Sequence, residues 1–179
     1  QFILYKSSLT PRAKSVLGQT KPEQLAFEVE DHLFESLSDT EASQGILGVF
    51  SVPEIHQPAK PGFVLILDQL RDPGNLGTIL RSAEAAGVQA VCLPPGTTDV
   101  WAPKVVRSGM GAHFRMQLLQ WPWEAISAYV EELAVFHADM QGQESLWQAD
   151  FRGRTALLIG GEAEGISPEG QQLATHSVR

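Results

Sequence analysis

The sequence contains a single cysteine, Cys92, among 179 residues. No disulfide can form within the chain, which fits a reducing compartment. The sequence also lacks an apolar run of the roughly 20 residues that a membrane-spanning helix needs. Its opening residues, QFILYKSS, show no charged leader, cleavage site or initiator methionine, so we interpret the chain as a fragment or a processed form. We expect a cytoplasmic protein, with an organelle as the alternative, and no membrane partner.

Several chemical motifs are missing as well. No histidine stands at metal-ligand spacing from a second ligand, so we expect no metal site at His32, His56, His113, His137 or His176. No G-x-G-x-x-G leads directly into a helix and no G-K-[ST] is present, which disfavours a dinucleotide-binding domain and a phosphate loop. Cys92, within AVCLPP, is expected to be a buried strand thiol and not a nucleophile.

Basic residues are scarce: 13 Lys and Arg stand against 21 Asp and Glu, giving a net charge of −8. This acidity argues against a nucleic-acid partner at first sight. The charge is unevenly spread, however. Residues 56–115 carry 6 basic and 4 acidic side chains, residues 1–55 carry 4 and 8, and residues 116–179 carry 3 and 9. The positive middle keeps RNA as a candidate partner, with ordinary solvated surface charge as the alternative.

What the sequence does contain is an ordinary globular composition, 43% hydrophobic and 19% charged. From residue 63 onward, predicted strands and helices alternate. The strands FVLILD (63–68) and TALLIG (155–160) are almost continuously apolar, which is typical of a parallel sheet covered on both faces. The predicted fold class is therefore α/β, with a mostly parallel sheet and helices on both faces.

The predicted elements follow from periodicity and from turn residues. Further strands are expected at 2–8, 45–52, 89–94, 113–120 and 134–140, and helices at 22–39, 75–87, 100–109, 122–134 and 167–176. The proline-rich stretch PEIHQPAKPG (53–62) is interpreted as a linker. We accordingly place a first domain at 1–55, the linker at 56–62 and a second domain at 63–179.

The stretch DPGNLGTILR (72–81) joins a turn to a helix and ends on an arginine. Asn75 is the predicted N-cap, and Gly87 is placed to end the helix in a left-handed conformation. Gly77 lies four residues before Arg81 on the same helical face, so we expect it to leave space for that side chain. Arg81 would then point at the carboxyl edge of the sheet, where open α/β sheets bind ligands. The alternative is an ion pair with Asp68 or Asp72.

A second candidate motif is TALLIGGEAEGIS (155–167), where a strand runs into a glycine-rich loop. Glycines let backbone amides approach a ligand closely. Ser167 followed by Pro168 predicts the start of a helix. Taken alone, an ordinary loop is the simpler interpretation of this stretch.

Together the two motifs resemble the SpoU (TrmH-type) branch of the SPOUT RNA methyltransferases over about residues 63–179. Asn75, Gly77 and Arg81 match the family's N-x-G-x-x-x-R, and Gly160, Glu162 and Gly165 match its G-x-E-x-x-G. The stretch DVWAPKVVRSGMGAHFRM (99–116) is similar to the segment that follows the first motif. The N-terminal part, with LSDTEASQGILGVF (37–50), resembles the end of an L30e-like α/β RNA-binding domain without its first half.

The resemblance implies a trefoil-knot domain, a homodimer, and 2′-O-ribose methylation of structured RNA with S-adenosylmethionine as the donor. It makes Arg81, Asn75 and Glu162 the catalytic residues. Arg81 is the catalytic arginine, Asn75 would hold the loop and contact the ribose, and Glu162 would fix the glycine loop or Asn75. Because arginine stays protonated, we expect Arg81 to grip a phosphate and stabilise the developing alkoxide. The expected donor-binding residues are Gly160, Gly161, Glu162 and Gly165. Ribosomal RNA is favoured over transfer RNA by the N-terminal resemblance alone.

Lys104, Arg107 and Arg115, together with Arg81, are candidates for RNA phosphate contacts, and ordinary surface cations are the alternative for the first three. The family's third motif, an I-P-M-like strand end followed by S-L-N, would come just after Arg179. It supplies much of the donor pocket and completes the knot, so we expect residues 1–179 alone to bind the donor poorly. The alternative function is a non-catalytic RNA-binding or assembly protein that keeps the fold.

Overall fold

The computed structural model describes residues 1–38, 40, 42–54 and 58–179. It divides into two compact units, Gln1–Pro53 and Glu54–Arg179, and each is described by itself. His56 and Gln57, the first two residues of the predicted linker 56–62, lie outside the described residues. The domain limits drawn from the sequence stay predictions.

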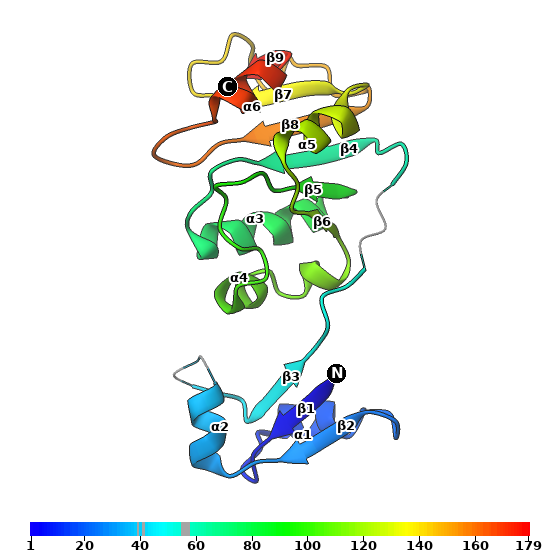
Figure 1. Cartoon of the computed structure of the whole chain (residues 1–179), viewed down its shortest axis with the longest axis vertical. Helices are drawn as coiled ribbons and strands as arrows, with labels where there is room; N and C mark the ends of the chain where they lie inside the picture. The colour runs from blue at the N-terminus through cyan, green and yellow to red at the C-terminus, as the bar shows by residue number, and fades with distance from the viewer. Residues whose placement is uncertain (39, 41, 55–57) are drawn as a thin grey trace. The chain divides into compact units, whose positions relative to one another are not determined.

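The first unit is a small α/β layer (Figure 1). Its three-stranded sheet has the order β2-β1-β3, with β1 parallel to β2 and antiparallel to β3. The elements are β1 (Phe2–Tyr5), α1 (Pro11–Leu17), β2 (Leu25–Glu28), α2 (Asp31–Leu37) and β3 (Ile46–Val49). The likeness to an L30e-like domain stays a prediction.

The single helix predicted over 22–39 is wrong in its first half, because residues 25–28 form β2. Leu25 lies beside Phe2 and Phe27 beside Leu4 in the parallel register of β2 on β1. These apolar residues alternate with a period of two, which the longer helical pattern concealed. The helix itself begins only at Asp31.

The second unit is built on a six-stranded sheet in the order β6-β5-β4-β8-β7-β9, and every neighbouring pair is parallel (Figure 1). The strands are β4 (Phe63–Leu67), β5 (Ala90–Cys92), β6 (Gln117–Leu119), β7 (Ala134–Ala138), β8 (Thr155–Ile159) and β9 (His176–Val178). The helices are α3 (Pro73–Ala85), α4 (Pro103–Ser108), the short 3₁₀ helix η1 (Ala112–Phe114), α5 (Trp123–Val130) and α6 (Pro168–Leu173).

Helices cover both faces of this sheet, as the sequence predicts. On one face, Leu65 and Leu67 of β4 pack in a core with residues of α3, α4 and η1. On the other face, Val64 and Ile66 pack in a second core with α5 and the start of the α6 segment. Full burial of an aliphatic side chain contributes about 1.5–3 kcal/mol. The central strand therefore supports both layers, which explains why it is apolar at consecutive positions.

Helix α3 begins earlier than predicted, and its N-cap is Asp72, not Asn75. Asp72 Oδ1 accepts a hydrogen bond from the backbone N–H of Asn75 at 2.7 Å, and Pro73 occupies the first turn, where no N–H is needed. The side chain of Asn75 is thereby left available for other contacts. At the other end, Gly87 has φ 77°, and the N–H of Val88 donates to Ala83 O at 3.0 Å, confirming the predicted left-handed cap.

Two local elements were not predicted. Residues 112–114 form η1, so the strand expected over 113–120 shortens to β6. Helix α6 ends at Leu173, and His176–Val178 then add to β7 as the edge strand β9. Within the described ranges, no helix is long and apolar enough to cross a membrane.

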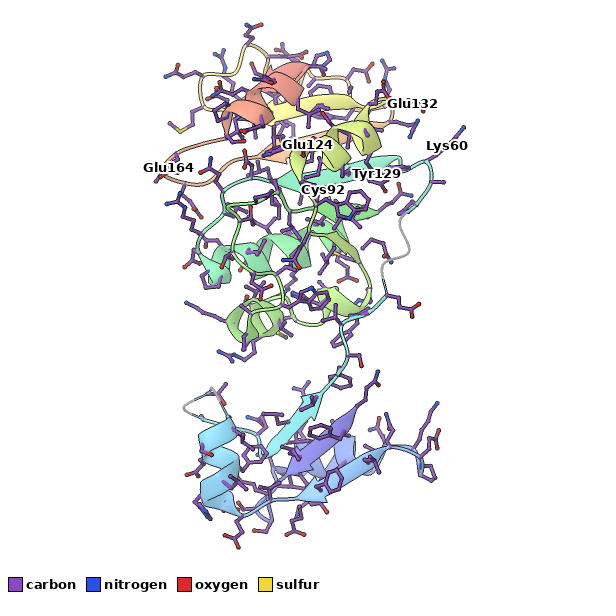
Figure 2. All side chains as sticks on the ribbon, viewed as in Figure 1. Lys60, Cys92, Glu124, Tyr129, Glu132 and Glu164 are labelled. Atoms are coloured by element: carbon purple, nitrogen blue, oxygen red, sulfur yellow. The ribbon has the colours of Figure 1, made fainter. Side chains whose placement is uncertain are left out.

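Within the second unit, side chains of α5 and of the residue before β8 hold the segment that precedes β4. Tyr129 Oη donates a hydrogen bond to Pro58 O at 3.1 Å, and Arg154 Nε donates to Pro61 O at 3.0 Å. Arg154 also pairs with Glu132 at 2.7 Å, and this hydrogen bond lowers the pKa of the Glu132 carboxyl. Figure 2 shows Lys60 and Glu132 on one side of the sheet and Glu164 on the opposite side, beyond the carboxyl ends of the strands.

Candidate active site

The candidate site lies at the point where the strand order reverses. From β4 the chain proceeds outward to β5 and β6 on one side, whereas β8, β7 and β9 lie on the other. Loops that leave the carboxyl ends of two such neighbouring strands diverge and form the usual ligand crevice of an open parallel sheet. Here these are residues 68–72 after β4 and residues 160–167 after β8, the two stretches singled out in the sequence.

Three polar contacts tie the β4–α3 segment, residues 68–75, to the second loop. At the base, the backbone N–H of Ser167 donates to Asp68 Oδ2 at 2.6 Å. Nearer the tip, Asn75 Nδ2 donates to Glu162 Oε1 at 2.5 Å. At the tip, Arg71 Nη2 donates to Glu164 Oε2 at 2.8 Å. The structure thus brings together Asn75 and Glu162, two of the three predicted catalytic residues, from positions 87 residues apart in the chain.

Asp68 is the anchor of the site and was missed as a candidate in the sequence. Its side chain is fully buried, and Oδ1 has no hydrogen-bond partner within the part of the chain that is described. Ser167, which it holds, is the N-cap of α6 and accepts from the N–H of Gly170 at 3.2 Å. The position of Asp68 directly after a buried parallel strand is the signal that could have identified it.

The glycines of the second loop have different roles. Gly161 and Gly165 exchange two backbone hydrogen bonds of 2.9 Å, which close the loop into a tight turn. A Cβ at Gly160 would lie 2.3 Å from the carbonyl carbon of Gly165, and one at Gly161 would lie 2.4 Å from Gln69 O. Gly165 instead has φ 70°, and a Cβ there would have nothing within 4 Å. The first two glycines therefore allow close backbone packing, and the third leaves an exposed stretch of backbone.

Gly77 does not leave space for Arg81, and this prediction is wrong. A Cβ at Gly77 would lie 1.8 Å from Ser108 Oγ and 2.6 Å from Val105 O. Ser108 Oγ also lies 3.3 Å from Pro73 O, so the end of α4 is held against the start of α3. The glycine permits this close approach of the two helices, and it thereby fixes where α4 presents Lys104.

The side chain of Arg81 is exposed and makes no hydrogen bond or ion pair within the described residues. The alternative partners are otherwise engaged, because Asp72 caps α3 and Asp68 holds Ser167. Arg81 follows Gly77 by one helical turn, so it lies on the side of α3 that faces α4. An exposed guanidinium without a protein partner can bind an anion bidentately.

The three other predicted RNA contacts differ in their surroundings. Lys104 and Arg107 are exposed on α4, three residues apart and therefore on one helical face. Arg115 instead donates to both oxygens of Glu84, at 2.7 and 3.0 Å. This pairing lowers the pKa of the Glu84 carboxyl through the hydrogen bond from Arg115. Arg115 consequently adds little net charge to the surface, and Lys104 is a stronger candidate than Arg115.

Other reactive side chains lie away from these loops. Cys92 is buried in β5, and burial raises the pKa of its thiol to about 12, which confirms the prediction of an inert strand residue. His113 is buried beside Trp101, with Nε2 2.8 Å from Val100 O. No cluster of three or more potential metal ligands occurs among the residues described.

The sequence and the fold both match known proteins. The chain is 45% identical over 115 residues to human "rRNA methyltransferase 3, mitochondrial", a match that covers 59% of this chain and 27% of that protein. It is 33% identical over 143 residues to the Bacillus subtilis "23S rRNA (guanosine(2553)-2′-O)-methyltransferase RlmP", covering 77% and 56%. An AdoMet-bound rRNA methyltransferase structure from Sinorhizobium meliloti superposes with a TM-score of 0.81 at 26% identity, covering all of this chain and 70% of that one.

The chain thus spans about a quarter to a half of the length of these two curated relatives. A model of the SpoU rRNA Methylase family matches residues 62–179, which include both loops of the candidate site and most of the second unit. By this match, and by the agreement of its parallel sheet with the solved relative, the chain belongs to the SpoU rRNA methylase family.

Proposed function

We propose that this chain forms the catalytic part of an S-adenosylmethionine-dependent 2′-O-ribose methyltransferase that acts on ribosomal RNA. One observation carries the proposal: Asn75, on the same helix as the exposed and unpaired Arg81, is hydrogen-bonded to Glu162 at the carboxyl edge of the sheet. Family membership and the names of the two curated relatives support the reaction and the class of RNA.

The donor site is assigned to the loop formed by Gly160, Gly161, Glu162 and Gly165. The loop fits a polar ligand, because residues 162–165 are exposed while Gly160 and Gly161 keep the turn compact. When bound, S-adenosylmethionine supplies a methyl group on a sulfonium, which is already a good leaving group. The residues of the protein then have mainly to place one sugar hydroxyl in line with that methyl group.

Arg81 supplies a fixed positive charge for the RNA. The guanidinium stays protonated, so it does not act as a base. It binds the phosphate next to the target ribose and stabilises the negative charge that develops on the attacking oxygen, whose proton passes to solvent at this exposed edge. The exposed position of Arg81, with no protein carboxylate to compete for it, fits this role.

Asn75 positions the ribose. Its amide nitrogen is engaged by Glu162, and this hydrogen bond fixes which way the amide faces. The carbonyl oxygen Oδ1, which accepts no hydrogen bond from the residues described, is then oriented to accept from the 2′-hydroxyl. Glu162 thereby has two tasks, since it belongs to the donor loop and orients the side chain that holds the acceptor.

Lys104 and Arg107 extend the phosphate contacts along α4. Arg115 contacts a phosphate only when its ion pair with Glu84 breaks. A homodimer and a trefoil knot, implied by the family resemblance, belong to the same proposal. For location, the cytoplasm and an organelle are the two alternatives, and the human relative named as mitochondrial favours the organelle. Cell fractionation followed by immunoblotting distinguishes them.

The function is tested by mapping ribose methyl groups in ribosomal RNA from cells with and without the full-length protein. We expect one or a few 2′-O-methyl groups to disappear with the gene and to return with the wild-type protein. Purified full-length protein should restore the same groups on unmodified RNA when S-adenosylmethionine is added. An unchanged methylation map, together with RNA binding by the purified protein, would instead identify a non-catalytic RNA-binding or assembly protein.

A further inference from the structure

The tip of the glycine loop carries two carboxylates, Glu162 and Glu164, and a different residue of the β4–α3 segment holds each of them. Asn75 holds Glu162, and Arg71 holds Glu164 at 2.8 Å. Asn75 belongs to the motif of the family, whereas Arg71 lies outside both motifs. The Arg71–Glu164 pair joins positions 93 residues apart and is thus a tertiary contact across the candidate site.

The glycine loop has a base held by buried and backbone hydrogen bonds, and an exposed tip, residues 162–164, held by two side-chain contacts. The base is fixed by the buried Asp68–Ser167 hydrogen bond and by the backbone pair between Gly161 and Gly165. Residues 162–164, between the two glycines, are exposed. Among the described residues, the contacts from Asn75 and Arg71 are the side-chain hydrogen bonds that reach this tip.

The Arg71–Glu164 pair also affects the Asn75–Glu162 hydrogen bond, through the charges of the two carboxylates. Glu162 and Glu164 are two residues apart, so their carboxylates repel each other across the tip. Arg71 neutralises Glu164 and draws it toward the β4–α3 segment, the same direction in which Asn75 draws Glu162. Without Arg71, Glu164 would be uncompensated within a short, glycine-bounded turn.

We propose that Arg71 is a positioning residue of the donor site: through Glu164 it holds the tip of the glycine loop in the conformation that receives S-adenosylmethionine. The inference rests on the proposed function of this loop and adds a residue to it. The side chains of Arg71 and Glu164 are 68% and 54% exposed, so the pair is a surface ion pair of modest strength. Its loss should weaken donor binding by roughly two- to fivefold, and salt should screen the effect.

The test measures the dissociation constant for S-adenosylmethionine and the kinetics of methyl transfer in the full-length protein. Arg71→Ala should raise the dissociation constant and the KM for the donor by about two- to fivefold at low salt, with kcat almost unchanged. The difference from wild type should shrink at about 1 M salt, where the Debye length is near 3 Å. Exchange of the charges, Arg71→Glu combined with Glu164→Arg, should recover donor affinity that Arg71→Glu alone loses.

Arg152→Ala is the matched control, because it breaks a surface pair of similar length, Arg152–Asp150 at 2.7 Å, in a different loop. It should leave donor binding unchanged. The proposal is overturned if Arg71→Ala binds the donor as the control does, or if the exchanged pair recovers nothing. It is also overturned if Arg71→Ala changes only the KM for RNA, since Arg71 would then be a phosphate contact.

These outcomes are separable from failure of the proposed function. If wild-type protein transfers methyl groups and Arg71→Ala does so with unaltered donor affinity, the role of Arg71 is wrong and the enzyme remains. If the full-length wild-type protein neither binds the donor nor methylates RNA, the proposed function itself is wrong.

Discussion

Gly77→Ala separates two explanations of a glycine in the middle of a helix. If the site were a simple solvent-exposed helical position, alanine would stabilise α3 by about 1 kcal/mol through its higher helix propensity. The structure predicts the opposite. The new Cβ would lie 1.8 Å from Ser108 Oγ, 2.8 Å from Ser108 Cβ and 2.6 Å from Val105 O.

The magnitude follows from these neighbours. Rotation of Ser108 can move its hydroxyl, but Val105 O belongs to the backbone of α4, so the whole helix must shift. Overpacking of this kind costs up to about 3 kcal/mol, and subtraction of the propensity gain of about 1 kcal/mol leaves a net destabilisation of roughly 2 kcal/mol. Adding Ser108→Gly removes two of the three close contacts and should recover part of this loss.

Urea unfolding followed by tryptophan fluorescence measures the free energy of unfolding of the second unit, which contains Gly77. All four tryptophans lie in this unit: Trp101, Trp121, Trp123 and Trp147. Gly153→Ala is the control, since a Cβ there has nothing within 4 Å and should change stability by less than about 1 kcal/mol. Close packing of Gly77 against α4 is refuted if Gly77→Ala raises the free energy of unfolding. It is also refuted if the double variant Gly77→Ala/Ser108→Gly is no more stable than Gly77→Ala alone.

Two further predictions concern buried polar groups in the second unit. Asp68→Ala should lower the free energy of unfolding by about 1–3 kcal/mol, because it removes the acceptor of the buried Ser167 N–H, whereas Asp68→Asn keeps an acceptor oxygen and should cost less; equal losses in urea unfolding would contradict this. Burial lowers the pKa of His113 below its ordinary 6.5, so the unfolded chain binds the proton more readily, and stability falls as the pH drops below about 6.5. His113→Gln keeps a donor for Val100 O without titrating, and it should flatten the loss of stability as the pH falls below about 6.5; an unchanged pH slope would show that His113 is not its source.

The sequence predicts the fold correctly where the pattern is local, as at helix ends, or repeats along a strand, as in the apolar runs. Consecutive apolar residues in β4 and β8 predicted the doubly covered parallel sheet, and Gly87 and Ser167 marked helix ends through their own chemistry. Parallel topology then placed residues 68–75 and 160–167 at the same edge. Because this rule needs only the order of the strands, the meeting of Asn75 and Glu162 could be anticipated in outline.

The failures share a physical cause, since each was decided by a partner distant in the sequence. Residues 25–28 became a strand because β1 offered a parallel partner. Asp72 displaced Asn75 as the N-cap, and Asn75 then bonded Glu162 across the crevice. Gly77 was explained by α4, whose position against α3 no local pattern reveals. The roles of Asp68 and Arg71 were not predicted, because their partners, Ser167 and Glu164, lie more than ninety residues further along.

The central claim is that the exposed and unpaired Arg81 assists methyl transfer to a ribose hydroxyl, and single-turnover kinetics test it most directly. The full-length protein and its Arg81→Ala and Arg81→Lys variants are compared at saturating S-adenosylmethionine and ribosomal RNA. We predict that Arg81→Ala slows the chemical step by roughly 10²–10³-fold, that Arg81→Lys lies between it and wild type, and that donor affinity is unchanged in both. Equal rates for Arg81→Ala and wild type would contradict the account.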